Sequence, residues 1–497
     1  MKIHVPLFPL AVCLMIGIAL CDWLNNWPIG LIPLTLIAIA TLAVKRHPRI
    51  QTIGIGCCVV LIGMIIGRKQ QQQLDVEWPT ECREWQAVVT SEPKVKEKLI
   101  VFDALSITGK NKWRCSVLRD KRSEQIQLGN GIVFYSQIKK IHEWQKGHFN
   151  YRRYLHCHGY TGEVFIRSHE WQSQALPLKD LSKIQRIRLL FLRWRHQLLE
   201  HFHQWDIDHE ASGVITAMTL GEKNNLSPTI KDTYSRVGAA HILALSGLHL
   251  MIIYSIISMI VGWWHRWRTA TQVITVLSIW GFALLTGLST SVTRSAFMIS
   301  IYALLSLGYR EKMSVNTLSF TAIIMLIINP YAMYDMGFQL SFLAVLGIVL
   351  YHPLINGIIP PHIQQNHRWL SIIWGTTTVS IAAQIGTAPL IVYYFGRFCT
   401  WFLLSNYIVI PMATIILYLA LFCIVFYWLP WVVNYAAIAL SFIATTMNRL
   451  LADISRLPLC SIEGIHISTL QLFLLYIIIG SIYIALSIRY SKALRNG

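Results

Sequence analysis

The chain has 497 residues, of which 54% are hydrophobic and only 13% are charged. A water-soluble surface cannot be built from this composition, so the chain is not an ordinary soluble enzyme, and its apolar excess must face lipid. The formal net charge is +19. The positive-inside bias of membrane proteins accounts for part of this charge, and the remainder suits a polyanionic substrate.

Three apolar runs open the chain, and each is close to the length that crosses a bilayer. They are Pro6–Leu24, Ile29–Val44 and Thr52–Gly67. The stretch Lys45–Arg49 is basic, whereas no basic residue separates the first two runs, which predicts a cytoplasmic amino terminus. The first run has no small-residue cleavage site and is expected to be retained. Residues 1–67 are therefore predicted to be N-terminal transmembrane helices.

Residues 68–180 have a different pattern, in which short runs alternate apolar and polar residues. Examples are Trp85–Val89, Lys98–Phe102 and Gly131–Tyr135. This alternation is typical of half-buried strands, and with the Gly- and Lys-rich turns between them the runs predict a small antiparallel β-barrel. Three crossings before this insert would place it in the periplasm.

Residues 181–235 are predicted to be amphipathic and linker helices. From Lys183 to Leu199 the apolar residues recur with a helical period. One face of this helix carries Ile184, Ile187, Phe191, Trp194 and Leu198. Basic side chains surround that face, so the helix is expected to lie on the membrane surface.

Residues 236–488 are apolar almost throughout, with breaks that divide them into about nine further spans. The predicted fold is a polytopic α-helical protein of the bacterial inner (cytoplasmic) membrane with about 12 spans, some of them re-entrant, and a periplasmic β-barrel insert. The basic clusters Arg266/Arg268 and Arg310/Lys312 fall on the cytoplasmic side, as does the basic tail at residues 489–497.

Polar residues inside apolar spans are costly unless they line water or meet a partner, so they are the natural candidates for function. Four polar clusters occur in the apolar region. They are Gly238–His249, Gly287–Met298, Asn329–Phe342 and Gln384–Pro389. The second cluster places Arg294 at the mouth of a span.

The first and third clusters contain the segments that carry a family resemblance. His241–His249 reads H-x-x-A-x-S-G-L-H, and Gly337–Phe342 reads G-F-Q-L-S-F. With Leu220–Lys223 ahead of them and a basic β insert before that, they resemble the competence domain of the ComEC family over roughly residues 80–411. The chain departs from the family at Ser295, where alanine is more usual, and at Thr290–Ser291, where proline is frequent.

The resemblance implies an inner-membrane channel that passes single-stranded DNA from periplasm to cytoplasm during natural transformation, with an oligonucleotide-binding (OB) type barrel as the insert. The implied partners are a periplasmic DNA receptor, a cytoplasmic helicase-like ATPase, and single-strand-binding and recombination-loading proteins. No cofactor is implied.

We predict two sets of DNA-facing residues. Residues expected to line the channel are His241, Ser246, Gly247, His249, Gly287, Arg294, Asp335, Gly337, Gln339, Ser341 and Gln384. Residues of the insert expected to contact DNA are Lys112, Arg114, Tyr151, Arg152 and Arg153. Structural readings stay open beside these: helix pairing for Arg294, interhelical hydrogen bonds for the two histidines, and helix packing for Gly337–Phe342. Aromatic residues of the insert, Trp144 and Tyr154 among them, either stack on bases or form its core.

The ten cysteines include no C-x-x-C pair, which argues against a structural zinc site or an iron–sulfur cluster. A periplasmic insert would allow a disulfide among Cys82, Cys115 and Cys157. We favour Cys115 with Cys157, while buried free thiols remain an equal alternative.

Members of the ComEC family often end in a metallo-β-lactamase-like nuclease domain, which this sequence is expected to lack. The run His201–His209 resembles a metal motif, but its spacing is wrong, and we read it as a linker. There is also no phosphate-binding loop, so we expect a transporter and not an enzyme. The alternatives are a transporter of another polyanion and an intramembrane serine protease built on Ser246.

Overall fold

The structure is a computed structural model that describes residues 6–23, 35–37, 39–41, 48–108, 110–174, 181–205, 207–262, 268–307 and 314–496. The chain divides into two compact units. The insert unit comprises residues 3–193 and 315–336, and the helical unit comprises residues 194–314 and 337–497. Most of the predicted span Ile29–Val44, together with Arg266, Arg310 and Lys312, lies outside the described residues.

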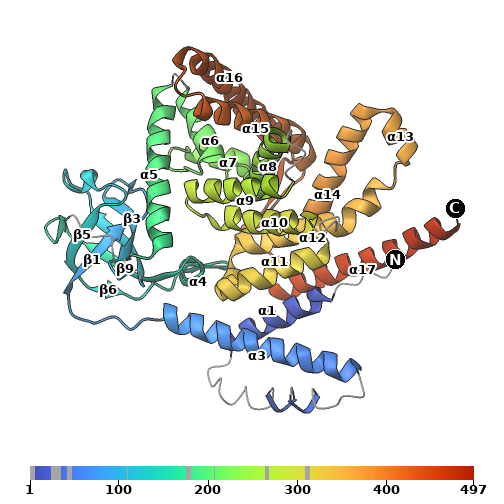
Figure 1. The fold of residues 1–497 in the computed structure, drawn as a ribbon, viewed down its shortest axis with the longest axis horizontal. Helices are drawn as coiled ribbons and strands as arrows, with labels where there is room; N and C mark the ends of the chain where they lie inside the picture. Colours follow the sequence, from blue (N-terminus) through green and yellow to red (C-terminus); the bar gives the residue numbers. More distant parts are fainter. Residues whose placement is uncertain are drawn as a thin grey trace. The chain divides into compact units, whose positions relative to one another are not determined.

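The insert unit contains one eight-stranded sheet with the order β10-β5-β1-β3-β4-β9-β6 and with β2 paired to β3 (Figure 1). The strands are β1 Arg83–Val89, β2 Lys94–Val95, β3 Leu99–Ser106, β4 Lys112–Leu118, β5 Gly131–Ser136, β6 Ile138–Lys139, β9 Tyr160–Ile166 and β10 Trp171–Ser173. All neighbours are antiparallel except β4 and β9, which run parallel. Strand β5 pairs with β1, and strand β6 pairs with β9. Only Gln137 separates β5 from β6. The strand order that runs from β1 through β3, β4 and β9 to β6 therefore leads along the chain back to β5, the other neighbour of β1. The predicted β domain is confirmed.

Alternation along the strands builds the core of this sheet. In β4, Trp113, Cys115 and Val117 are buried, whereas the residues between them are partly exposed. The Trp113 ring meets the rings of Trp78 and Trp85 edge to face, at centroid distances of 5.8 and 5.6 Å. Such offset aromatic contacts add to the burial of large apolar surfaces and fix the inside of the domain.

Close backbone contact joins the first helices of the insert unit. Its helices are α1 Leu7–Trp23, α3 Pro48–Leu74, α4 Tyr151–Cys157, α11 Val315–Ile328 and the 3-10 helix η4 Pro330–Tyr334. A Cβ added to Gly17 would lie 2.1 Å from the carbonyl oxygen of Val60, and one added to Gly63 would lie 2.6 Å from that of Leu14. Glycine is therefore required where α1 and α3 cross.

The helical unit has a first core built from α6 His209–Thr219, α7 Pro228–Arg236, α15 Phe402–Val425 and α16 Pro430–Ser455, together with the C-terminal part of α5 Lys183–Gln204. Phe202, Met218 and Met447 are buried in it. The side chain of Ser227 caps α7 by accepting a hydrogen bond from the Ile230 N–H at 3.2 Å, and Pro228 occupies the first turn.

Six further long helices, one short helix and two short strands belong to the helical unit. They are α8 Gly247–Gly262, α9 Arg268–Leu285, α10 Thr290–Leu307, α12 Met336–Asn356, α14 Arg368–Phe395 and α17 Thr469–Asn496, with the short helix α13 Pro361–Asn366 and the paired strands β11 Arg397–Cys399 and β12 Ser461–Glu463. Helices α8, α9 and α10 share a second core. Two tyrosines fasten α17, since the Tyr351 hydroxyl donates to the Ile479 carbonyl at 2.6 Å and the Tyr476 hydroxyl donates to that of Gly386 at 3.0 Å.

Six of the described helices are long and apolar enough to cross a membrane: α3, α12, α14, α15, α16 and α17. Shorter apolar helices lie at Leu7–Cys21, Gly247–Met259, Thr269–Leu285 and Val315–Ile328. A helical membrane protein is confirmed, while the count of about 12 spans stays a prediction.

The amphipathic helix predicted from Lys183 is present as α5. Its buried side chains are Leu189, Leu192, Leu199 and Phe202, whereas Ile184 and Trp194 of the predicted apolar face are 71% and 46% exposed. The helix therefore has a second apolar face beyond the one that packs in the protein, as expected of a helix that also touches lipid.

Candidate functional site

The first polar cluster begins where α7 ends. Gly238 has a left-handed φ of +77°, and the Ala239 N–H donates to the Tyr234 carbonyl at 2.8 Å, which closes the last turn of the helix. A Cβ on Gly238 would lie 3.2 Å from the Cβ of Cys399. Both the backbone conformation and the close approach therefore require glycine at this turn.

His241 lies in the loop that follows. Its side chain is exposed, and its Nδ1 lies 3.1 Å from the Gly238 carbonyl oxygen. Desolvation by the surrounding protein nevertheless lowers the pKa of His241. The channel-lining role of His241 stays a prediction.

Ser246 and His249 form the N-terminal cap of α8. The Ser246 N–H donates to Nδ1 of His249 at 3.2 Å, and the Ser246 hydroxyl lies 2.9 Å from the same nitrogen. His249 thus does what glutamate or glutamine does at the third position of a capping box. Because Nδ1 accepts a backbone hydrogen bond, the neutral ring carries its proton on Nε2. The S-G-L-H segment is therefore a helix start, with His249 only 2% exposed.

The first and second clusters meet at Gly247. A Cβ on Gly247 would lie 3.2 Å from Oγ of Ser295 in α10. Leu245 belongs to the same buried core as Val292. Gly221, in the Leu220–Lys223 turn, has φ +74°, and its Cβ would lie 2.7 Å from a methyl carbon of Leu245. The Leu220–Lys223 turn, the first cluster and the second cluster thus converge on one place.

The second cluster starts with a strained turn between α9 and α10. Gly287 and Leu288 both have left-handed φ, +80° and 57°. The Leu288 N–H donates to the Ala283 carbonyl at 2.8 Å, and its side chain packs against the core of α8, α9 and α10. A leucine in this region is uncommon and costs about 1–2 kcal/mol, so the packing must hold it there.

Arg294 follows on α10 and is 3% exposed. It interacts with other residues of the protein. A guanidinium buried among apolar helices is costly without such compensation, and an arginine in this setting serves either function or helix pairing. The structure therefore places Arg294 in the interior, next to Ser295 and the Gly247 contact.

The third and fourth clusters form a second pair. The Tyr394 hydroxyl donates to Oε1 of Gln339 at 2.9 Å, which joins α14 to α12. The helices touch most closely at Gly347 and Gly386, where added Cβ atoms would lie 2.4 and 2.2 Å from carbonyl oxygens of the facing helix. The remaining predicted residues on these two helices are half-buried, namely Gly337, Ser341 and Gln384.

Asp335 belongs to the insert unit and not with Gln339. It is 8% exposed and follows η4. This part of the chain is tied to α4, because the Cys157 thiol donates to the Tyr331 carbonyl and the Asn329 amide donates to that of Cys157, both at 3.0 Å.

The predicted cations of the insert are engaged with its own residues. Lys112 lies 3.9 Å from Asp103 and over the ring of Tyr160, and burial lowers its pKa to about 8. Arg114 stands opposite Asp103 in the ladder of β3 and β4. Arg152 donates to Asp75 at 2.6 Å and also to Glu143.

Two further residues predicted to contact DNA lie at α4. The Tyr151 hydroxyl donates to Glu163 at 2.8 Å, and burial raises its pKa to about 12. Arg153 stacks over the Tyr334 ring at 4.5 Å. These contacts order the surface around α4, and the DNA-binding role of all five residues stays a prediction.

A ladder of four rings lies beside these residues. Trp144 contacts Phe149, Phe149 contacts Tyr154 and Tyr154 contacts His158, with centroids 6.3, 5.6 and 4.5 Å apart. Trp144 is 48% and Tyr154 is 42% exposed. Phe149 and His158 were not predicted, although aromatic and basic residues interleave from Lys139 to His158.

A model of the family described as competence protein matches residues 218–489, more than half of the chain. The chain belongs to the competence-protein family. This finding confirms the predicted membership of the ComEC family, and it covers all four polar clusters.

Individual relatives of this competence protein are distant. ComE operon protein 3 of Bacillus subtilis (strain 168) is 23% identical over 338 residues, which are 67% of this chain and 41% of that protein. An uncharacterized protein of Aquifex aeolicus (strain VF5) is 28% identical over 234 residues, 46% of this chain and 48% of that protein. The chain thus spans less than half the length of these relatives. No solved structure matches it.

An ion pair of the competence protein escaped the sequence analysis. Arg195 in α5 donates to Glu222 at 2.6 Å, and the two side chains are only 12% and 9% exposed. Glu222 also accepts from the Asn224 N–H at 2.9 Å. The pair fastens α5 to the Leu220–Lys223 turn. An acidic residue directly after a glycine in the Leu220–Lys223 segment was the available signal.

Cys115 and Cys157 are separate free thiols and not a disulfide. Cys115 points into the sheet core, and the Cys157 thiol donates to the Tyr331 carbonyl. The alternative of buried thiols is therefore what the structure contains. Strand β4 and helix α4 aim the two side chains at different partners.

The His201–His209 run forms the end of α5 and the start of α6. Asp208 caps α6 by accepting from the Ala211 N–H at 3.2 Å, and the His201 ring contacts that of Tyr427. Among the described residues, no group of three or more His, Cys, Asp or Glu side chains could hold a metal ion. The reading of this run as a linker agrees with these contacts.

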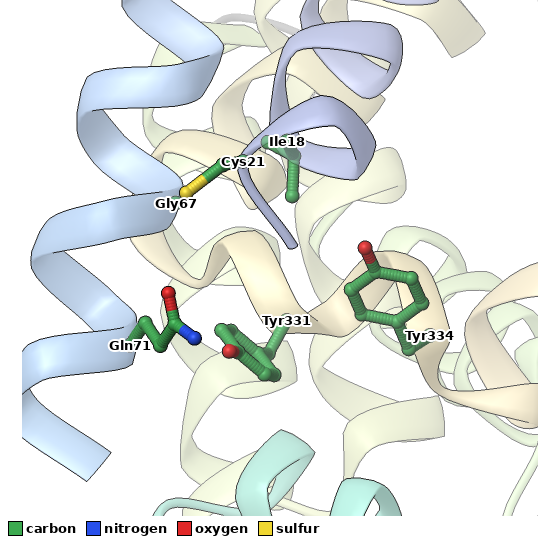
Figure 2. Close-up of a pocket in the computed structure, with 6 residues that line it drawn as sticks. All are labelled: Ile18, Cys21, Gly67, Gln71, Tyr331 and Tyr334. Carbon is green, nitrogen blue, oxygen red and sulfur yellow. The ribbon is translucent and has the colours of Figure 1, made fainter. Parts of the chain in front are cut away.

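A recess in the insert unit is lined by Ile18, Cys21, Gly67, Gln71, Tyr331 and Tyr334. Figure 2 shows the Gln71 side chain pointing toward Tyr331 and the Cys21 sulfur pointing toward Gly67. The recess leaves no room for a water molecule, so it is packing space between α1, α3 and η4 and not a binding site.

Proposed function

We propose that this competence-family protein is an inner-membrane channel that passes single-stranded DNA from the periplasm into the cytoplasm during natural transformation. One observation carries the proposal: the Gly247–Ser295 contact brings the S-G-L-H cap of α8 against α10 beside the buried Arg294, in a chain of the competence family.

The chemistry of the substrate explains why these residue types would be needed. Each phosphate carries a full charge, and its transfer into hydrocarbon is prohibitive without water or polar partners. Arg294 would supply a fixed positive charge, and the turn at Gly287 and Leu288 precedes it on the same helix–turn segment. His241 is exposed in the loop before α8 and would face water at this site.

The distribution of basic residues along the chain supports a cytoplasmic carboxyl terminus and a periplasmic insert. Helix α17 ends in the basic residues Arg489, Lys492 and Arg495, which favours the cytoplasm for the carboxyl terminus. If α12, α14, α15, α16 and α17 each cross once, η4 at the start of α12 lies on the opposite side. Because η4 bonds to Cys157 of the insert, the insert would be periplasmic.

The insert is proposed to be an OB-type barrel. Five strand positions follow one another as β1, β3, β4, β9 and the continuous β5/β6, which leads back to β1. The parallel pairing of β4 with β9 and the return to β1 support this assignment. In chain order, helix α4 comes after β6 and before β9.

The ring ladder Trp144, Phe149, Tyr154 and His158 is the proposed contact for incoming bases. Exposed aromatic rings stack on bases of any sequence, and each stacked base contributes about 1–3 kcal/mol. Lys139, Lys140 and Arg153 stand near the ladder in the chain and would attract the phosphates. The DNA strand would thus be held by the insert before it reaches Arg294.

The energy for transport is proposed to come from outside the chain. Candidates are a helicase-like ATPase in the cytoplasm and capture of the strand by single-strand-binding and recombination-loading proteins. A periplasmic receptor would deliver the DNA. The protein itself is proposed to act without cutting DNA and without a cofactor.

A serine hydrolase is the second candidate, because the Ser246 hydroxyl lies 2.9 Å from His249. The cap of α8 explains this contact without catalysis, so we rank it below the channel. Labelling of the purified protein by a fluorophosphonate at Ser246 would support the hydrolase.

The proposed function is tested by deleting the gene in a competent strain and restoring it. The deletion should abolish transformation while surface-bound DNA persists, and the restored gene should recover it. Normal transformation in the deletion strain would reject the channel and favour transport of another polyanion.

A further inference from the structure

Two cysteines that are distant in the sequence meet at one end of the helical unit. Cys399 ends β11, and Cys460 directly precedes β12. The strands pair antiparallel with Cys399 opposite Ser461, and the Thr400 N–H donates to the Cys460 carbonyl at 3.2 Å. Both are free thiols in the structure. The backbone pairing thus brings Cys399 and Cys460 to neighbouring positions of the two segments.

Both thiols also lie against the turn that ends α7. A Cβ on Gly238 would lie 3.3 Å from Sγ of Cys399, and the Cys460 thiol donates to the Arg236 carbonyl at 3.7 Å. Arg236 in turn lies 3.7 Å from Glu463 of β12. The cysteine pair therefore supports the segment that leads into His241 and Ser246.

The compartment decides what chemistry such a pair undergoes. Under the orientation proposed above, on which this inference rests, α14 ends and α15 begins on the side of the insert, and α16 ends there too. Strands β11 and β12 would then be periplasmic. Paired thiols in an oxidising compartment are converted to disulfides, whereas cytoplasmic thiols stay reduced.

We propose that Cys399 and Cys460 are an oxidation site that forms a disulfide between the β11 and β12 segments. One cysteine thiolate attacks the disulfide of a periplasmic dithiol–disulfide oxidoreductase, which forms a mixed disulfide and releases one donor thiolate. The other cysteine thiolate then attacks its partner's sulfur and releases the donor. The cysteines lose two electrons, the donor disulfide gains them, and the two protons pass to the donor thiols.

The exchange belongs to membrane insertion, before the helical unit is packed. Cys399 and Cys460 are 9% and 5% exposed in the folded protein. Burial also raises the pKa of Cys399 to about 12, so its reactive thiolate is scarce once the fold is complete. After closure, the same burial would shield the bond from reduction.

The consequence is a covalent link around the helix pair α15 and α16, since Cys399 precedes α15 and Cys460 follows α16. A bond that closes a long loop restricts the unfolded chain and so favours the folded state. The bond would also hold in place the two segments that contact the turn at Gly238, which leads into the first polar cluster.

The test counts oxidised cysteines in the full-length protein isolated from native membranes. Free thiols are blocked with N-ethylmaleimide under denaturing conditions, the protein is reduced, and newly exposed thiols are tagged with a polyethylene-glycol maleimide that shifts the band. We expect Cys399→Ser, Cys460→Ser and the double variant each to carry two fewer tags than the wild type. Cys423→Ser, which removes a buried thiol of α15, is the matched control and should match the wild type.

Equal numbers of tags in the wild type and the double variant would overturn the proposal. Mass spectrometry of unreduced wild-type protein gives a second readout that needs no variant: a linked peptide pair containing Cys399 and Cys460 is expected, and both residues alkylated would contradict the disulfide. Neither readout uses DNA, so a negative result leaves the channel proposal standing, and failed DNA uptake by an oxidised protein would count against the channel alone.

Discussion

A Cβ added to Gly347 of α12 would lie 3.2 Å from the Cα of Gly386 in α14, so the two helices cross with their backbones nearly in contact. Small residues allow this approach inside a membrane, where packing and not the hydrophobic effect drives helix association. Because Gln339 and Gln384 lie on the same two helices, the crossing sets the spacing between the third and fourth polar clusters.

Replacement of Gly386 by leucine should therefore disrupt the helical unit. The added side chain would meet the Leu343 carbonyl, which lies 2.2 Å from the position of a Cβ. Gly375→Leu is the matched control, because it lies on the same helix and a Cβ there meets nothing within 4 Å. We expect a loss of folded protein in membranes and a lower melting temperature in detergent for Gly386→Leu only. Equal behaviour of the two variants would refute the crossing.

The role of His249 in capping α8 predicts different losses of stability for two substitutions. His249→Ala removes the side chain that accepts the Ser246 N–H and should cost about 1 kcal/mol, the usual effect of losing a helix cap. His249→Gln should recover much of this loss, since glutamine serves at that position of a capping box. Denaturation in mild detergent compares the variants. Stability equal to wild type in His249→Ala would contradict the capping role.

The buried ion pair between Arg195 and Glu222 should behave as a unit. Arg195→Ala or Glu222→Ala alone leaves one buried charge without its partner and is expected to cost about 3–5 kcal/mol. The double variant should be less destabilised than the sum of the singles, which a double-mutant cycle measures. Lys231→Ala on the exposed side of α7 is the control. Strict additivity would show that the two side chains do not interact.

Lys112 gives the insert a pH dependence of stability. Its pKa is lowered from 10.5 to about 8, mainly by burial. The folded state therefore binds fewer protons than the unfolded state between these values, and stability should rise as pH increases from about 8. Lys112→Met removes this contribution, so the difference in melting temperature between variant and wild type should shrink from pH 7.5 to 9.5. A constant difference would contradict the assignment.

The membrane class, the β domain and the family were predictable because each depends on a pattern that extends over many residues. Alternation in β4 and the helical period of α5 are read directly from residue order. The S-G-L-H segment was noticed as polar residues in an apolar region, but its capping geometry was not, because which ring nitrogen meets Ser246 depends on the turn into α8.

Pairings between distant residues could not be predicted in the same way. Helix packing brings Arg195 to Glu222, and the pairing of β11 with β12 brings Cys399 near Cys460. The local sequence identifies neither partner. The favoured Cys115 with Cys157 shows the converse error: both lie in one domain, but β4 and α4 direct their sulfur atoms apart. Asp335 groups with the insert unit although only Met336 separates it from Gly337, and its channel-lining role stays a prediction.

The most direct test of the channel measures labelled single-stranded DNA that reaches the cytoplasm of competent cells carrying Arg294→Ala, with Arg294→Lys and the full deletion alongside. Arg456→Ala, an exposed arginine of the same unit, is the control, and membrane levels are checked by immunoblot. The account predicts that Arg294→Ala falls toward the deletion while DNA accumulates outside, that lysine restores part of the uptake, and that the control stays normal. Normal cytoplasmic DNA in Arg294→Ala and in the deletion would contradict it.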